Sequence, residues 1–191
     1  MYHIKDDQRS MRSSEMIYEG LAKLMRDKDF AAITVTDLVD AAGVGRTTFY
    51  RNFDEIEDVL LMRCDQVVEG LIGYLQEYRQ KYPDEPRTTI LKPFLRYFYL
   101  HSELLEMLMK AKRIHIFEEA LLTRFEPFRS MLGAYYGIEL DYVDYVMAMR
   151  IGGVTNILIH WVTTGKKQAP DALAEKLGAI TSQMVALEQL L

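Results

Sequence analysis

The chain has 191 residues, 49% of them hydrophobic and 27% charged, and its formal net charge is −5 at pH 7. This composition belongs to a folded globular protein and excludes a disordered or fibrous chain. The negative net charge also excludes a protein that coats nucleic acid through bulk positive charge. Any DNA affinity must therefore come from where individual side chains point.

The cysteine content and the apolar stretches indicate the compartment. Cys64 is the only cysteine, so the chain cannot form an internal disulfide or a cysteine-based zinc site. The first residues contain no apolar run of the kind found in a signal peptide. The longest apolar stretch, residues 146–162, is short for a membrane span and contains Arg150 and His160. We therefore expect a cytoplasmic protein without membrane contact.

A first helix is expected over residues 9–27, because Ile17, Leu21 and Leu24 recur at the spacing of one helix face. Residues 1–8 before it are expected to form a loose arm. The apolar face of this helix would supply one wall of a small N-terminal core.

The next stretch, which ends at Phe53, predicts two short helices around a tight turn. Thr34 suits an N-cap, and Asp37 three positions later completes a capping box. Gly43 suits the position just past a helix end, where a positive φ is easy only for glycine. The second helix follows with Phe49 and Phe53 on its inward face.

The outward side of that second helix carries basic and hydroxyl groups. Its outward residues are Arg46, Thr47, Tyr50 and Arg51, and positions 41–53 contain no acidic residue. Two helices around a glycine turn with such a surface form a helix-turn-helix, whose second helix enters the major groove of DNA. The alternative is an ordinary packed corner between two helices.

Asp54 is expected to cap a long helix, with Glu57 three positions on completing a capping box, and this helix is expected to stop at Tyr82 and Pro83. A continuous helix can transmit a tilt from one part of the chain to another, as a flexible linker cannot. We divide the chain accordingly into a helix-turn-helix domain, residues 1–53, and a helical ligand-binding and dimerisation domain, residues 54–191.

The C-terminal part is expected to be helical to its end. Further helices are predicted near residues 90–100, 103–110, 114–135 and 143–164 and from Pro170 onward, with Pro127 kinking or splitting the third of them. Six apolar residues of the last helix recur at alternating spacings of four and three, namely Leu173, Leu177, Ile180, Met184, Leu187 and Leu191. We expect the last two helices to form the interface of a homodimer, although a monomer could bury this seam internally. No strand pattern competes, so the fold class is all-α.

The stretch from Val35 to Phe53 resembles the DNA-binding segment of the TetR family of bacterial transcriptional regulators. The matching residues are Val35, Asp37, Leu38, Ala41, Gly43, Val44, Thr48, Phe49, Tyr50 and Phe53. The order of helices also resembles that family, with three N-terminal helices, a long connecting helix and a helical C-terminal domain. The resemblance implies a ligand-responsive regulator, expected to be a repressor, that binds a near-palindromic double-stranded DNA operator as a homodimer.

The resemblance also implies roles for individual side chains at the DNA. Base edges would be contacted by Arg46, Thr47 and Arg51, and phosphates by Thr34, Thr36, Thr48, Tyr50 and Asn52. These assignments agree with chemistry, because arginine can bind a guanine edge through two hydrogen bonds and hydroxyl groups are good phosphate donors.

Two positions depart from the family pattern. Gly45 stands where a capping serine is usual, and Ile56 stands where many members have a lysine. The turn around Ile56 is also acidic, with Asp54, Glu55, Glu57 and Asp58. We therefore expect DNA binding that is weaker or more selective than is usual in the family.

The resemblance further implies an effector pocket in the C-terminal domain for a small apolar or aromatic ligand of unknown identity. The candidate lining residues are Tyr74, Tyr78, Phe98, Met107, Phe117, Asn156, His160 and Trp161. Aromatic and methionine side chains suit an adaptable apolar cavity, and Tyr74, Asn156 and His160 would be its polar anchors. Taken singly, most of these apolar residues are expected in the core.

The sequence gives no support for an enzyme. His115 and Glu118 form a lone His-x-x-Glu pair without the repeated carboxylates of a helical di-iron site. No glycine-rich phosphate loop or Gly-x-Ser-x-Gly turn occurs, so we expect no catalytic residue, metal or cofactor. Two alternatives to a DNA-binding regulator stay open. One is the same fold acting through a protein partner, and the other is an all-helical small-molecule carrier or enzyme.

Overall fold

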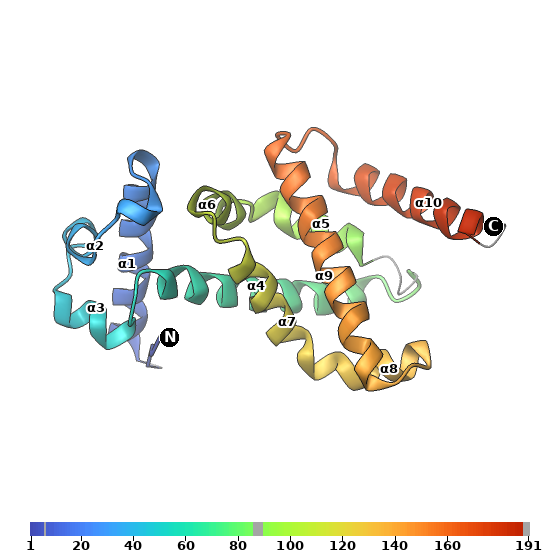
Figure 1. The fold of residues 1–191 in the computed structure, drawn as a ribbon, viewed down its shortest axis with the longest axis horizontal. Coiled ribbons are helices and arrows are strands. Elements are labelled where there is room, and N and C mark those ends of the chain that lie inside the picture. Colours follow the sequence, from blue (N-terminus) through green and yellow to red (C-terminus); the bar gives the residue numbers. More distant parts are fainter. Residues whose placement is uncertain (6, 86–89, 189–191) are drawn as a thin grey trace. The chain divides into compact units, whose positions relative to one another are not determined.

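The computed structural model describes residues 1–5, 7–85 and 90–188, with side chains described up to residue 181. It confirms the all-α class, because these residues form helices, with one isolated β-bridge between Tyr2 and Phe53 and no strand (Figure 1). The elements in chain order are α1 (Gln8–Asp27), η1 (Phe30–Ala32), α2 (Val35–Ala42), α3 (Arg46–Asn52), α4 (Glu57–Lys81), α5 (Leu91–Leu100), α6 (Glu103–Ala111), α7 (His115–Phe125), η2 (Glu126–Phe128), α8 (Arg129–Tyr136), α9 (Leu140–Thr163) and α10 (Pro170–Glu188).

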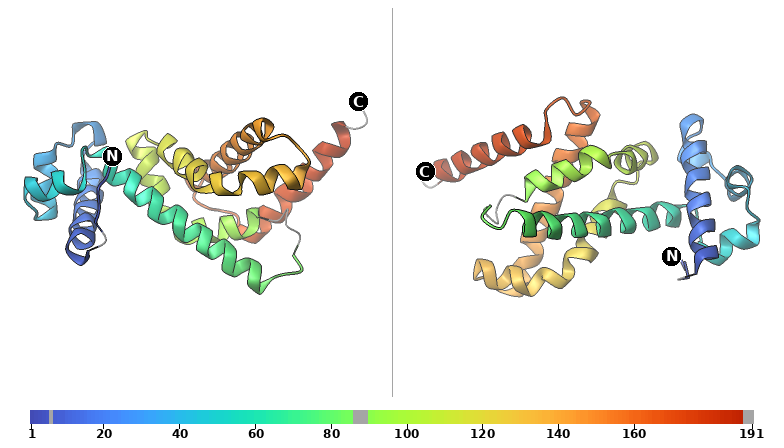
Figure 2. Two further views of the ribbon diagram at one scale, coloured as in Figure 1. Left: turned by 90° about the horizontal axis from the view of Figure 1, so that it is seen from below. Right: turned by 180° about the vertical axis from the view of Figure 1, so that it is seen from behind.

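The helices group into two compact units. The first unit contains Met1–Val67 and Glu103–Arg124, and the second contains Val68–Ser102 and Phe125–Leu191. Helix α4 is one unbroken helix, as both views of Figure 2 show, and it contributes its first part to one unit and its second part to the other. The division after residue 53 that the sequence indicates concerns function rather than packing, and it stays a prediction.

The core of the first unit begins with the three N-terminal helices, as the sequence predicts. Ile17 and Leu21 of α1, Leu38 of α2, and Phe49 and Phe53 around the end of α3 are all fully buried. Helices α1 and α2 also cross closely. A Cβ added at Gly20 of α1 would lie only 3.0 Å from the Cβ of Ala42 on α2, so a larger residue at position 20 would push the two helices apart.

Residues 1–5 are not the loose arm that we expected. The backbone N–H of His3 donates to the carbonyl oxygen of Asn52 at 2.8 Å, and the hydroxyl of Tyr2 donates to the carboxylate of Asp65 at 2.6 Å. Asp7 then caps α1, with its carboxylate accepting from the N–H of Ser10 at 2.7 Å. These bonds tie the segment to the end of α3 and to α4.

Helices α6 and α7 complete the first unit. The guanidinium of Arg113, in the turn between them, donates to the carboxylate of Glu57 in the first turn of α4 at 2.6 Å. The ammonium of Lys110 donates to the carbonyl oxygen of Arg26 near the end of α1 at 2.9 Å. The turn after α6 is therefore fastened to the helices that carry the helix-turn-helix.

The second unit is held by pairs of packed helices. Arg96 of α5 binds Asp171 of α10 through two hydrogen bonds of 2.6 and 2.5 Å, and α8 packs against α9. The indole N–H of Trp161 donates to the carbonyl oxygen of Gln168 at 3.0 Å and fixes the turn from α9 into α10. The predicted positions of both prolines are confirmed, since Pro127 lies in η2 between α7 and α8 and Pro170 begins α10.

The apolar seam of α10 is described only in its first half. Leu173 and Leu177 are half-buried, and Ile180 is exposed. Met184, Leu187 and Leu191 lie outside the residues whose side chains are described.

The described part of the chain has neither a membrane-spanning helix nor a cluster of metal-ligating side chains. None of its helices combines the length and apolar character needed to cross a bilayer. Within the same residues, no three His, Cys, Asp or Glu side chains gather where they could hold a metal ion.

Candidate nucleic-acid interface and ligand pocket

The first helix of the helix-turn-helix begins with the predicted capping box. The N–H of Asp37 donates to the hydroxyl oxygen of Thr34 at 3.2 Å, and the N–H of Thr34 donates back to the carboxylate of Asp37 at 2.8 Å. Lys28 also binds this carboxylate at 2.6 Å. The hydrogen bond from Lys28, followed by those from Thr34, holds the pKa of Asp37 well below its usual range. Gly43 ends the helix with φ of 66°, in the left-handed region as expected.

The second helix, α3, presents the predicted faces. Phe49 is fully buried, and Tyr50 beside it is 56% exposed. Arg46, Thr47 and Arg51 are exposed as well, so the basic and hydroxyl groups do point outward. Gly45 is the N-cap and supplies no side-chain hydrogen bond, which leaves the first N–H groups of α3 free of a capping side chain.

Arg46 is held by a residue of the preceding helix. Its terminal guanidinium nitrogen donates to the hydroxyl oxygen of Thr36 at 2.7 Å. Thr36 was expected to meet a phosphate. In the structure it orients the arginine that leads α3, and its own hydroxyl hydrogen is still available to donate.

Asn52 does not have the surface role that the sequence reading assigned to it. Its side chain is fully buried. The amide donates to the hydroxyl of Ser13 at 3.1 Å and to the carbonyl oxygen of Thr48 at 3.0 Å, and its oxygen accepts from the hydroxyl of Ser10 at 2.7 Å. The expectation of a phosphate contact is therefore corrected, because Asn52 ties α3 to α1 inside the core.

The remaining two threonines also differ in role. The hydroxyl of Thr34 donates to Asp37 at 2.7 Å while accepting the capping bond, so its hydrogen-bonding capacity is largely used within the helix start. Thr48 is partly exposed on α3. Its side chain stays available for the predicted phosphate contact.

The acidic turn after α3 is partly structural. Asp58 is 4% exposed, and its carboxylate accepts from the backbone N–H groups of Asp54 and Glu55, both at 3.0 Å. It is Asp58 that reaches back to cap this turn, whereas we expected Asp54 to be the cap. Glu57 is paired with Arg113. Only Asp54 and Glu55 of the four acidic residues are exposed, so the turn presents less negative charge than its sequence indicates.

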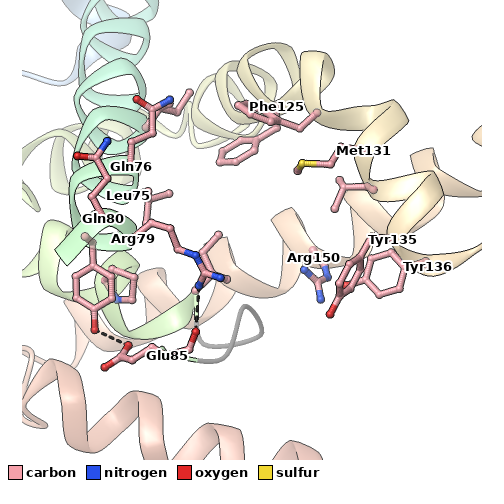
Figure 3. Close-up of a pocket in the computed structure, with 16 residues that line it drawn as sticks. Leu75, Gln76, Arg79, Gln80, Glu85, Phe125, Met131, Tyr135, Tyr136 and Arg150 are labelled. Carbon is pink, nitrogen blue, oxygen red and sulfur yellow. Dashed lines mark hydrogen bonds between the residues drawn. The ribbon is translucent and has the colours of Figure 1, made fainter. Parts of the chain in front are cut away.

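The second unit contains a pocket of about 590 Å³, within the range of small-molecule sites. Figure 3 shows it between α4, the start of α5, and the segment from Phe125 through α9. Its lining residues are Ile72, Leu75, Gln76, Tyr78, Arg79, Gln80, Glu85, Ile90, Pro93, Phe125, Phe128, Met131, Leu132, Tyr135, Tyr136 and Arg150.

Polar groups of the pocket gather around Glu85. The hydroxyl of Tyr78 donates to its carboxylate at 2.7 Å, and a guanidinium nitrogen of Arg79 donates to its backbone carbonyl oxygen at 3.1 Å (Figure 3). Burial, followed by the hydrogen bond to Glu85, raises the pKa of Tyr78 to about 12, so this phenol stays neutral at physiological pH.

Of the predicted ligand-binding residues, only Tyr78 lines this pocket. Phe98 and Trp161 are buried in the core of the second unit, and Tyr74 packs on Tyr97 at 5.7 Å between ring centroids. The other four lie elsewhere: Met107 and Phe117 in the first unit, and Asn156 and His160 exposed on α9. For these seven residues, the placement in the pocket is corrected.

The sequence reading missed the polar residues Gln76, Arg79 and Arg150 and the aromatic residues around η2. One signal was available, since Arg150 interrupts the most apolar helix of the chain. A charge in such a helix must face water, a partner or a cavity.

Comparison with known proteins identifies the family of the helix-turn-helix segment. Residues 17–61, which lie between α1 and the start of α4, match the family model described as bacterial regulatory proteins, tetR family. This segment is a TetR-family DNA-binding domain. The resemblance of the helix-turn-helix stretch is thereby confirmed.

The curated relatives include two regulators. The uncharacterized HTH-type transcriptional regulator YxbF of Bacillus subtilis is 20% identical over 171 residues, which cover 87% of this chain and 44% of YxbF. The HTH-type transcriptional regulator EthR of Mycobacterium tuberculosis is 34% identical over 76 residues, which cover 40% of this chain and 35% of EthR. The chain thus spans less than half the length of these relatives.

Solved structures show that the fold is shared along nearly the whole chain. Lin0861 from Listeria innocua superposes with a TM-score of 0.76 at 17% identity, over 95% of this chain and 96% of that one. The fatty acid degradation regulator FadR from Bacillus halodurans gives a TM-score of 0.57 at 15% identity, over 90% and 93%. These identities establish the TetR-type fold alone.

Proposed function

We propose that this TetR-family chain is a ligand-responsive transcriptional repressor. It binds a near-palindromic operator as a homodimer and leaves it when a small molecule enters the second unit. The observation that carries the proposal is the two-sided character of α3. Phe49 and Phe53 are fully buried, while Arg46, Thr47 and Arg51 are exposed, and positions 41–53 contain no acidic residue.

The chemistry of that exposed face suits the DNA major groove. A guanidinium can bind the O6 and N7 atoms of guanine through two hydrogen bonds, and Arg46 is already oriented by Thr36. The hydroxyls of Thr47, Thr48 and Tyr50 suit phosphate and base contacts. Two copies of α3 in a dimer would read half-sites about one DNA turn, roughly 34 Å, apart.

The exposed face of α9 supports a dimer. Its residues recur at helical spacing and are all exposed, namely Tyr142, Tyr145, Met149, Gly153, Asn156, His160 and Thr163. Three of them are large and apolar, with Tyr145 75% exposed and Met149 70% exposed. Nothing lies within 4 Å of a Cβ added at Gly153, so the glycine is not needed within the single chain. A stripe of this kind suits a second α9 crossing at close range.

The position of the pocket supports ligand response. Helix α4 lines it with residues from Ile72 to Gln80, and the same helix begins in the first unit at Glu57. A ligand that binds one position of α4 better than another would therefore bias the DNA-binding unit through one helix.

Fluorescence anisotropy on DNA from upstream of the protein's own gene, at two salt concentrations, tests DNA binding. Arg46→Ala should lose about 1–3 kcal/mol of specific binding, which is roughly fivefold to 150-fold in Kd. Arg26→Ala is the matched control, because Arg26 is an exposed arginine at the end of α1. Equal, weak binding of every fragment, with no change in Arg46→Ala, would favour action through a protein partner.

Sedimentation velocity tests the dimer. Met149→Glu should shift the protein to a monomer, because it places a charge in the proposed apolar interface. Met11→Glu is the control, since Met11 is also an exposed methionine, at 55%, but lies on α1. A monomeric wild-type protein would refute this part of the proposal.

A further inference from the structure

The pocket contains two guanidinium groups without a carboxylate partner among the described residues. Within the described ranges, Arg79 of α4 donates only to the backbone carbonyl oxygen of Glu85. Arg150 of α9 lies over the ring of Tyr136, with 5.3 Å from the guanidinium carbon to the ring centroid. In Figure 3 the Arg79 side chain extends from α4 toward the side of the pocket where Arg150 and Tyr136 lie.

Other arginines of the same chain are paired with acidic side chains. The ion pairs are Arg63–Glu15, Arg96–Asp171, Arg113–Glu57, Arg124–Asp65 and Arg129–Asp144. These five are among the seven described arginines that follow residue 53. The other two are Arg79 and Arg150 of the pocket.

Glu85, the one carboxylate among the described lining residues, does not cancel the charge of both arginines. It accepts from the hydroxyl of Tyr78 at 2.7 Å and already pairs with the ammonium of Lys92, outside the lining, at 3.5 Å. Arg79 and Arg150 are two positive groups against this one negative group. The described lining therefore has a positive net charge, although the whole chain carries −5.

The rest of the lining is mostly apolar. Leu75 of α4 faces the same cavity as Phe125, Phe128, Met131 and Leu132. Figure 3 shows Phe125 and Met131 across the pocket from Glu85 and from the guanidinium of Arg79. A ligand that matches both parts has a hydrophobic body and one anionic end.

We propose that this pocket binds a hydrophobic carboxylate, with the acid group between Arg79 and Arg150 and the hydrocarbon part against Phe125, Phe128 and Met131. The effector role of this ligand rests on the proposed function. Binding of the ligand to the pocket does not depend on that function. Arginine suits the acid group because its planar fork donates two parallel hydrogen bonds to a carboxylate. A cationic ligand would meet like charges, and a neutral one would leave both guanidinium groups covered but unpaired.

Isothermal titration calorimetry with decanoate and decan-1-ol on the full chain tests the assignment. These probes share their hydrocarbon part and differ in the anionic end. The variants are Arg79→Gln, Arg150→Gln and the control Lys176→Gln, which removes one positive charge from exposed α10 outside the pocket. Arg150 is exposed and makes only the ring contact, so its variant is expected to fold normally.

We expect decanoate to bind the wild type at least about tenfold more tightly than decan-1-ol, since a charge-assisted hydrogen bond contributes on that order. Each arginine variant should lose about tenfold for decanoate and little for decan-1-ol, and Lys176→Gln should lose neither. Equal binding of the two probes, arginine variants that bind like the wild type, or no decanoate binding would each overturn the proposal.

Anisotropy on DNA separates this inference from the proposed function. If decanoate binds through the arginines but leaves DNA affinity unchanged, the carboxylate site stands and the ligand-responsive role fails. If specific DNA binding is present but decanoate does not bind, the regulator stands and the carboxylate assignment fails.

Discussion

The role of Asn52 can be decided by replacing it with alanine. Asn52 would contact phosphate according to the family pattern, but its side chain is fully buried and bonds Ser10, Ser13 and Thr48. Asn52→Ala removes the acceptor of the Ser10 hydroxyl and the donor to the Thr48 carbonyl. A buried polar group left without its partner costs about 1–3 kcal/mol, and the lost side-chain volume adds a cavity.

We therefore expect the free energy of unfolding to fall by roughly 3 kcal/mol, a large part of the usual total of about 5–15 kcal/mol. Urea unfolding followed by circular dichroism measures the loss, and hydrogen exchange of the α1 and α3 amides locates it. Gln66→Ala is the matched control. Gln66 is an exposed amide of the same unit that accepts one hydrogen bond from Arg63, so its loss should stay within about 0.5 kcal/mol.

A double-mutant cycle sharpens the test. The double variant Ser10→Ala/Asn52→Ala lacks the Ser10 hydroxyl, so no hydroxyl group is left without an acceptor. Its loss of unfolding free energy should therefore be smaller than the sum of the losses in the two single variants. Full stability of Asn52→Ala together with a loss of DNA affinity would refute the reasoning, because Asn52 would then act at the DNA surface.

Four further outcomes follow from the same contacts. Thr36→Val should weaken operator binding several-fold in anisotropy without changing thermal unfolding, because it frees the Arg46 guanidinium. Ile56→Lys should raise DNA affinity and steepen its salt dependence by about one phosphate contact; no change in either would contradict the predicted loss of that contact. Lys28 and Thr34 lower the pKa of Asp37 from its ordinary 3.8, so their stabilisation is present above that pH and lost as pH falls. Thermal unfolding of Asp37→Asn should then depend less on pH between about 5 and 3 than that of the wild type. Cys64 should react with a thiol reagent only on unfolding, since burial raises its pKa to about 12.

Local sequence rules predicted most of the helix-turn-helix because they act over a few residues. The capping box of Thr34 and Asp37, the positive φ of Gly43 and the uncapped start at Gly45 each follow from one or two side chains and the backbone beside them. The inward face with Phe49 follows from helical period alone.

Most of the wrong predictions concern contacts between residues far apart in the sequence. Asn52 looks like a surface residue on α3 until Ser10 and Ser13, about forty positions earlier, are brought against it. Similarly, Phe117 reads as a cavity residue, but α7 packs in the first unit. Aromatic content predicts that a cavity can exist without showing which rings fill the core and which line the space.

Helix α4 is the element on which the proposed coupling depends. Its sequence makes the second part of the helix easier to bend than the first. Its first part is anchored by Val59 and Leu60, both fully buried. Its second part contains two glycines close to the point where the helix passes from one unit to the other. A Cβ at Gly70 would lie 2.6 Å from the hydroxyl of Tyr97 and would have to displace that side chain, whereas nothing lies within 4 Å of a Cβ at Gly73. Each glycine weakens a helix interior by roughly 0.5–1 kcal/mol, so α4 can bend most easily beside Ile72 and Leu75, where it meets the pocket. A ligand that fixes this part of α4 would limit the conformations of the same helix that begins next to the proposed DNA-contacting residues of α3.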